Sequence, residues 1–104
     1  AALTAGYTAA SSDQGTKSSG TFTPDLTGRN VQHYTNGGAH TLAPPTGHGS
    51  LILDMTNNGS ASAVTTSGFT KVTGDSLTTT NGHKFRFFIS VGNAGSHLHK
   101  QAMQ

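Results

Sequence analysis

The side chains most capable of chemistry in this chain are its six histidines. His97 and His99 are two residues apart in a stretch with strand character, so both side chains should lie on one face. Two imidazoles on a strand can bind a transition metal, but a catalytic zinc needs a third protein ligand, and no carboxylate lies near this pair in the sequence. We therefore predict no metal and no cofactor. His97 and His99 remain weak candidates for a metal site, and we expect them to form hydrogen bonds at a subunit contact or to lie in solvent.

The other reactive residues do not form a recognisable catalytic pattern. Ser50 follows His48 in a Gly-His-Gly-Ser sequence, which differs from the Gly-x-Ser-x-Gly elbow of hydrolases and lacks the helix that follows that elbow. The chain has no cysteine and only four acidic residues. One of these, Asp75, stands between Gly74 and Ser76 and is typical of a turn. We predict that the protein is not an enzyme.

Composition indicates a single domain that suits assembly. The 104 residues include 32% apolar and only 10% charged residues, so the core is thin and little charge repulsion opposes association.

No apolar run is long enough to span a membrane. The first residues lack a basic region followed by an apolar run, so we expect synthesis in a cytoplasm. No nucleic-acid partner is predicted because the basic residues are scattered: Lys17, Arg29, Lys71, Lys84, Arg86 and Lys100.

Residues 84–91 predict the central strand of the fold. Phe88 breaks the alternation of apolar and polar residues because it shares the polar face with Arg86. It could form a cross-strand pair, or this second face could be covered by another subunit or by another part of the chain. The inward face should carry the residues at alternate positions, which are Phe85, Phe87, Ile89 and Val91.

The rest of the chain beyond residue 29 reads as short strands separated by Gly and Asn turns. Residues 36–39 predict a hairpin turn between strands at 31–35 and 40–43. Residues 63–72 predict either one strand bent at Gly68 or two strands, and residues 77–80 predict a further strand. Turn signals recur roughly every 8–12 residues, a spacing typical of an antiparallel sandwich or barrel, and no helical period is present. We predict an all-β domain at 29–104, an antiparallel β-sandwich (jelly-roll-like) or a small barrel.

Residues 1–28 are rich in Ser, Thr, Gly and Ala. Such a segment cannot bury enough apolar surface to offset its ordering entropy. We expect an extended N-terminal arm that lies on a partner, or else an arm folded back on its own domain. The predicted partner-binding residues, including those expected on the final strands, are Tyr7, Phe22, Leu26, Phe88, His97 and His99.

Several turns and strand faces of the chain form a pattern that matches a known family, without a catalytic consensus. The matching segments are residues 20–24, 40–44, 51–57, 67–75 and 78–82, with a closing strand that ends near residue 102. On these segments, from about Gly20 onward, the chain resembles small β-sandwich proteins of tailed bacteriophages. These occur as capsid decoration (cement) proteins and as modules of tail fibres and spikes.

The resemblance implies a virion protein, commonly a trimer. We expect a decoration protein on the capsid surface, bound to the major capsid protein and to copies of itself. A tail fibre, spike or collar module is the first alternative. A carbohydrate-binding module that uses Tyr7 and Tyr34 is the second, and a metal enzyme that uses His97 and His99 is the third. Because imidazole gains a proton in mild acid, an assembly held by histidines should loosen there.

Overall fold

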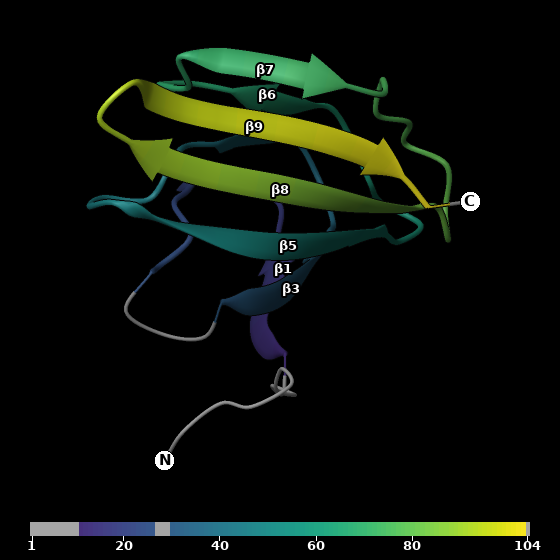
Figure 1. Cartoon of the computed structure of the whole chain (residues 1–104). Helices are drawn as coiled ribbons and strands as arrows, with labels where there is room; N and C mark the ends of the chain where they lie inside the picture. Colours follow the sequence, from purple (N-terminus) through teal and green to yellow (C-terminus); the bar gives the residue numbers. More distant parts are fainter. Residues whose placement is uncertain (1–10, 27–29, 104) are drawn as a thin grey trace, which may run out of the picture.

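A computed structural model describes residues 11–26 and 30–103, and within them the chain is all β. Nine strands form a six-stranded sheet in the order β1-β3-β5-β8-β9-β7 and a three-stranded sheet in the order β2-β4-β6 (Figure 1). No helix of the described residues could cross a membrane. The strands are β1 Ser12–Lys17, β2 Thr21–Phe22, β3 Val31–Asn36, β4 His40–Leu42, β5 Gly49–Asn57, β6 Val64–Thr66, β7 Lys71–Gly74, β8 Lys84–Gly92 and β9 Gly95–Ala102.

The first six strands wind back and forth between the two sheets. β1, β3 and β5 pair in parallel in one sheet, and β2, β4 and β6 pair in parallel in the other. One pass of the chain consists of a strand in the six-stranded sheet followed by a strand in the three-stranded sheet. Each pass therefore stacks on the previous pass. The predicted antiparallel pairing is wrong for these strands and also for β7, which pairs with β9 in parallel. It is correct only for the pairings of β8 with β5 and with β9.

The predicted hairpin at residues 36–39 is a corner between sheets, because the side chain of Asn36 points into the protein. Its Nδ2 donates to Asn57 Oδ1 at 3.2 Å and to the Ser62 carbonyl at 2.9 Å. Its Oδ1 accepts from the Gly38 N–H at 3.2 Å. These bonds hold the chain at the edge of one sheet and direct it to the other, so β3 and β4 do not pair. A turn-forming sequence alone does not distinguish the two outcomes.

Asn57 repeats this arrangement one pass later. It lies directly beside Asn36 in the parallel register of β3 and β5. Its Nδ2 donates to the carbonyls of Thr78 and Thr80 at 2.7 and 3.1 Å. The predicted strand at residues 77–80 is therefore wrong, because this segment bonds to a side chain instead of a neighbouring strand. Residues 63–72 form two strands, β6 and β7, that belong to different sheets.

β8 is an interior strand, as predicted, with β5 on one side and β9 on the other. A short turn after Gly92 leads directly into β9. β8 reverses the parallel run of the sheet, because its neighbours on both sides are antiparallel to it. Residue alternation holds along the strand, and the inward side chains of Phe85, Phe87 and Ile89 are buried.

Both sheets contribute to one hydrophobic core. Figure 1 shows β6 behind β9, and the three-stranded sheet supplies Phe22 and Leu42 to the same buried cluster as β3, β5, β8 and β9. Tyr34 packs against Phe22, with ring centroids 5.0 Å apart. The buried members are Phe22, Tyr34, Leu42, Leu51, Leu53, Met55, Phe85, Phe87, Ile89 and Leu98.

Residues 11–26 lie back on their own domain, which is the alternative given above for the N-terminal arm. β1 pairs with β3, and β2 pairs with β4, so this part of the chain completes both sheets. Phe22 is a core residue and not an anchor on a partner. Residues 1–10, including Tyr7, lie outside the described residues. The arm was predicted because the strands of this segment contain few apolar residues, and parallel pairing supplies the backbone partners that composition does not reveal.

A candidate binding groove on the outer face

The outer face of the six-stranded sheet carries an apolar row that crosses three strands. Ile52 pairs with Val31 on one side and with Phe88 on the other, and Phe88 pairs with His99. Residues paired in this way place their side chains close together on the same face. Phe88 is 42% exposed, in contrast to its buried neighbours in the strand. The row thus ends in an exposed aromatic ring next to an imidazole, with centroids 6.2 Å apart.

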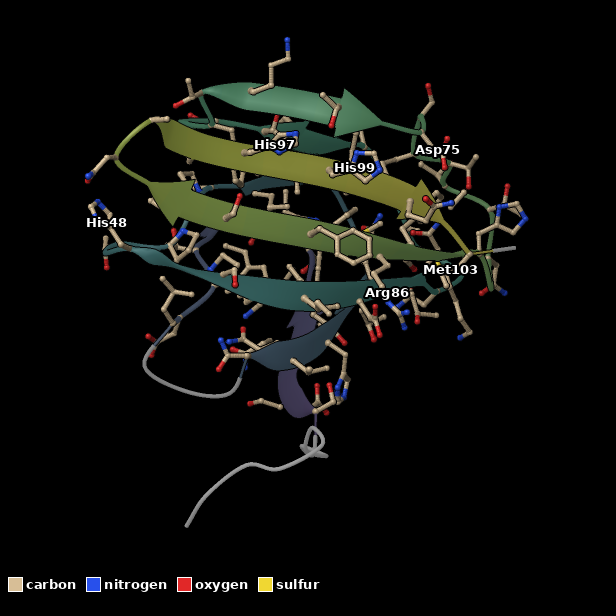
Figure 2. All side chains as sticks on the ribbon, viewed as in Figure 1. His48, Asp75, Arg86, His97, His99 and Met103 are labelled. Carbon is tan, nitrogen blue, oxygen red and sulfur yellow. The ribbon has the colours of Figure 1, made fainter. Side chains whose placement is uncertain are left out.

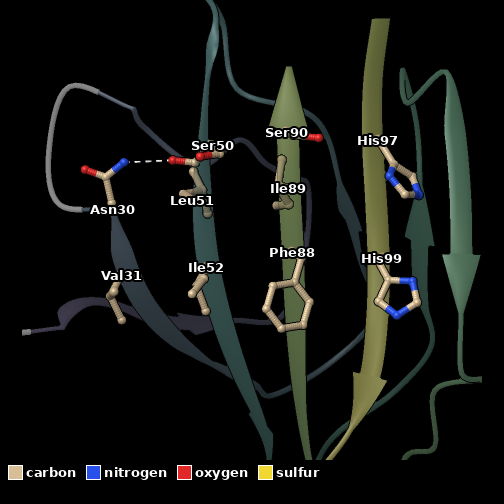
Figure 3. Close-up of a pocket in the computed structure, with 10 residues that line it drawn as sticks. All are labelled: Asn30, Val31, Ser50, Leu51, Ile52, Phe88, Ile89, Ser90, His97 and His99. Carbon is tan, nitrogen blue, oxygen red and sulfur yellow. Dashed lines mark hydrogen bonds between the residues drawn. The ribbon is translucent and has the colours of Figure 1, made fainter. Parts of the chain in front are cut away.

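A polar row runs beside the apolar row, one step along the same strands. Ser50 pairs with Ser90, and Ser90 pairs with His97. Asn30 extends this row, since its Nδ2 donates to the Ser50 carbonyl at 2.7 Å. Figure 3 shows the two rows side by side, with Asn30, Ser50, Ser90 and His97 in one and Val31, Ile52, Phe88 and His99 in the other.

The two rows line a shallow groove of about 460 Å³, which we call the outer-face groove. Leu51 of β5 and Ile89 of β8, which are buried residues of the core, also line it. The residues that line it are Asn30, Val31, Ser50, Leu51, Ile52, Phe88, Ile89, Ser90, His97 and His99.

The two histidines of the groove are held by one threonine of the edge strand β7. Thr73 Oγ1 lies 2.8 Å from His97 Nε2 and 2.8 Å from His99 Nδ1. A hydroxyl has one proton and two lone pairs, so it can donate to one ring while it accepts from the other. The contacts fix both rings and leave His97 Nδ1 and His99 Nε2 on the sides away from Thr73. The structure therefore brings His97 and His99 together. The group that bonds to both of them is the Thr73 hydroxyl of the same chain.

Charged residues occupy the next row along the sheet. Arg86 and Asp54 form a two-pronged ion pair, with Nε to Oδ1 at 2.8 Å and Nη2 to Oδ2 at 3.2 Å. The hydrogen bond and charge of Asp54 raise the pKa of the Arg86 guanidinium. Further along this row His33 Nε2 lies 3.8 Å from Asp13 Oδ1. The charges of Arg86 and Asp54 compensate each other beside the groove, and none of these four residues lines it. Figure 2 shows Arg86 on the same side of the sheet as His97 and His99.

Three of the predicted partner-binding residues, Phe88, His97 and His99, converge at this groove. Leu26 is half-buried and packs on the core, so it does not belong to the groove. Sequence reasoning missed the residues from other strands: Val31, Ile52 and Thr73. Their signal lies in the register between strands, which the sequence does not display. Tyr34, the aromatic expected on a carbohydrate platform, is buried.

Among residues 11–26 and 30–103 no three His, Cys, Asp or Glu side chains are close enough to hold a metal ion. The groove instead offers hydrogen-bonding groups and an aromatic ring. Comparisons with protein-family models, with curated proteins and with solved structures find no match to this chain.

Proposed function

We propose that this chain is a structural module of a tailed-bacteriophage particle, and most simply a capsid decoration protein. In this role many copies bind the outer surface of the major capsid lattice and stabilise the head. The proposal rests on the resemblance of its strands and turns to phage virion proteins. A sandwich-like unit that associates as a homo-oligomer, with a trimer as the expected state, fits this role.

The structural observation that supports a discrete module is the way in which its sheet edges are interrupted. In β1 the register shifts between Asp13 and Thr16, around Gly15 with a φ of 81°. Lys17 Nζ lies 4.7 Å from the Phe22 ring centroid, beside the edge of the second sheet. Bulges, lysines and short strands are the devices that oppose edge-to-edge pairing. The other edge strands, β2, β6 and β7, are only two, three and four residues long.

A tail fibre or spike module is the second candidate, and the parallel winding favours it. Ser12 pairs with Gln32, and Gln32 pairs with Leu53, so successive passes superimpose. Architectures of this kind can extend by adding passes. The interrupted edges argue against such extension within this unit, although they leave open a terminal position in a longer protein.

Binding to purified particles tests the proposal. Labelled protein is added to phage heads that lack it and to isolated tails, and occupancy is measured by sedimentation and by a cryo-EM map. A decoration protein should saturate regular sites on the head and raise its thermal stability by mass action. Saturable binding to tails alone would select the second candidate. Binding to neither would overturn both.

A further inference from the structure

We propose that the outer-face groove binds a neutral saccharide, with a sugar ring stacked on Phe88 and its hydroxyls bonded by the polar row. This site goes beyond the proposed function and does not depend on it. A saccharide has apolar C–H faces and polar edges in the same ring. The groove offers an apolar row and a polar row along adjacent positions of the same strands.

Phe88 supplies the surface for stacking. The ring is 42% exposed, and Figure 3 shows it face-on, lying across β8 between Ile52 and His99. The face of an aromatic ring carries a partial negative charge, whereas the hydrogens on sugar carbons carry a partial positive charge. The ring sits on an interior strand of the sheet, so its backbone is fixed before a ligand arrives. Little conformational entropy is then lost on binding.

The polar row is also held in place in advance. Asn30 Nδ2 is bonded to the Ser50 carbonyl, which fixes the Asn30 amide at the end of the row. Thr73 binds the inner nitrogens of His97 and His99, so their other nitrogens can bond to a sugar hydroxyl. Hydroxyls, amides and imidazoles both donate and accept. They match the hydroxyl groups of a sugar, which do the same.

The lining favours a ligand without charge. None of the ten residues that line the groove is Asp, Glu, Lys or Arg. Arg86, in the adjacent row, makes two bonds to Asp54 and is compensated by it. An anionic ligand such as a phosphate would meet no unpaired guanidinium in this lining. Neutral hexose chains are therefore the class that the site fits best.

Size and apolar area favour a saccharide over a docked protein. The groove volume of about 460 Å³ lies within the range of small-molecule sites. Its apolar row contains only Val31, Ile52 and Phe88. A stable protein interface usually buries a much larger surface around several aromatic or arginine anchors. A second copy of this chain on the same face is the main rival occupant.

The test uses neutral oligosaccharides as probes in a glycan array, followed by NMR titration of the full chain. Phe88→Ala should weaken binding by about tenfold, as expected for loss of one aromatic stacking contact. Ser90→Ala should weaken binding less. Val72→Ala is the matched control, because Val72 is exposed like Phe88 but lies on β7 outside the groove. Its affinity should be unchanged.

Two further results decide the proposal. Circular dichroism must show that the Phe88→Ala protein is folded, and its exposed position makes this the expected result. A Phe88→Trp protein, with a larger ring, should bind at least as tightly as the wild type. Absence of binding to every neutral oligosaccharide, or equal binding by Phe88→Ala, would overturn the proposal. Self-association of the wild type that Phe88→Ala abolishes would also overturn it, in favour of a protein contact.

Discussion

Phe87 and Phe88 are adjacent in β8 but lie on opposite faces of the six-stranded sheet, with exposed fractions of 0% and 42%. The inner face around Phe87 is apolar and closed by the three-stranded sheet. The outer face around Phe88 mixes an aromatic ring, imidazoles, hydroxyls and an ion pair. The same strands thus carry two unrelated sets of residues, one for each face.

The comparison separates folding from binding. Inner-face residues contact several strands at once, so a change there disturbs the packing of the whole domain. Outer-face residues contact neighbours in one layer and solvent, so many substitutions there should leave the fold intact. A surface that the fold does not constrain can be adapted to a ligand. The predictions below place side chains of both faces on one scale of unfolding free energy.

Phe87→Ala should have the largest effect. The ring is fully buried and pairs with Leu53 across the strands, and loss of such a ring leaves a cavity that costs about 3–5 kcal/mol. In a domain with so thin a core, this loss could remove most of the stability. Urea unfolding followed by circular dichroism measures it. Phe87→Leu is the control and should cost clearly less, and equal losses for the two variants would contradict the cavity argument.

Asn57→Ala should have the next largest effect. The buried amide donates to two carbonyls and accepts from Asn36, so its removal leaves polar groups without partners at a cost of about 1–3 kcal/mol. Asn58→Ala is the matched control, because its Oδ1 accepts from the Ser60 N–H within the exposed turn. Both are measured by urea unfolding. If Asn58→Ala were the more harmful change, the interior amide pair would not be what holds the passes together.

Tyr34→Phe should change the pH dependence of stability. Burial raises the pKa of the Tyr34 phenol above its ordinary value. Above about pH 10 the unfolded chain loses this proton while the folded protein keeps it, so the unfolded state binds fewer protons and stability falls as pH rises. Unfolding free energy of the wild type should therefore fall more steeply above pH 10 than that of the variant, by up to about 1.4 kcal/mol per pH unit. Equal slopes would contradict this.

The same substitution should also lower stability at neutral pH. The Tyr34 hydroxyl lies 2.9 Å from His40 Nε2, and His40 Nδ1 donates to the Gly38 carbonyl at 2.9 Å. The same hydroxyl donates to Met55 Sδ at 3.0 Å, so Tyr34→Phe removes a buried group that bonds to both the thioether and the imidazole nitrogen. The expected loss is about 1 kcal/mol.

The sequence predicted the strands better than their pairing. Alternation at Phe85, Phe87 and Ile89 is a local property, and the structure confirms it. Whether a turn returns the chain to the same sheet or sends it to the other depends on a side chain such as Asn36, whose partner Asn57 is distant in sequence. The all-β class was therefore predictable, while the parallel winding was not.

The candidate groove could be predicted only in part for the same reason. His97 and His99 share a face because they are two residues apart on one strand, and Phe88 was identified because it interrupts the pattern of β8. Ile52 and Thr73 reach the site through the register of β5 and β7. Register is fixed by the whole sheet, so residues from separate strands could not be assigned to one site from the sequence.

Phe88→Ala should have the smallest effect on stability. Much of the ring is already in solvent, so its removal should change the free energy of unfolding by no more than about 0.5 kcal/mol. Phe88→Ala and Phe87→Ala should be measured under the same urea conditions. Residue type and strand are the same in the two variants, so a difference in unfolding free energy reflects the face of the sheet. A loss as large as that of Phe87→Ala would mean that something covers the outer face in solution. The wild type should then show concentration-dependent stability that the variant lacks, because a partner copy stabilises only the folded chain.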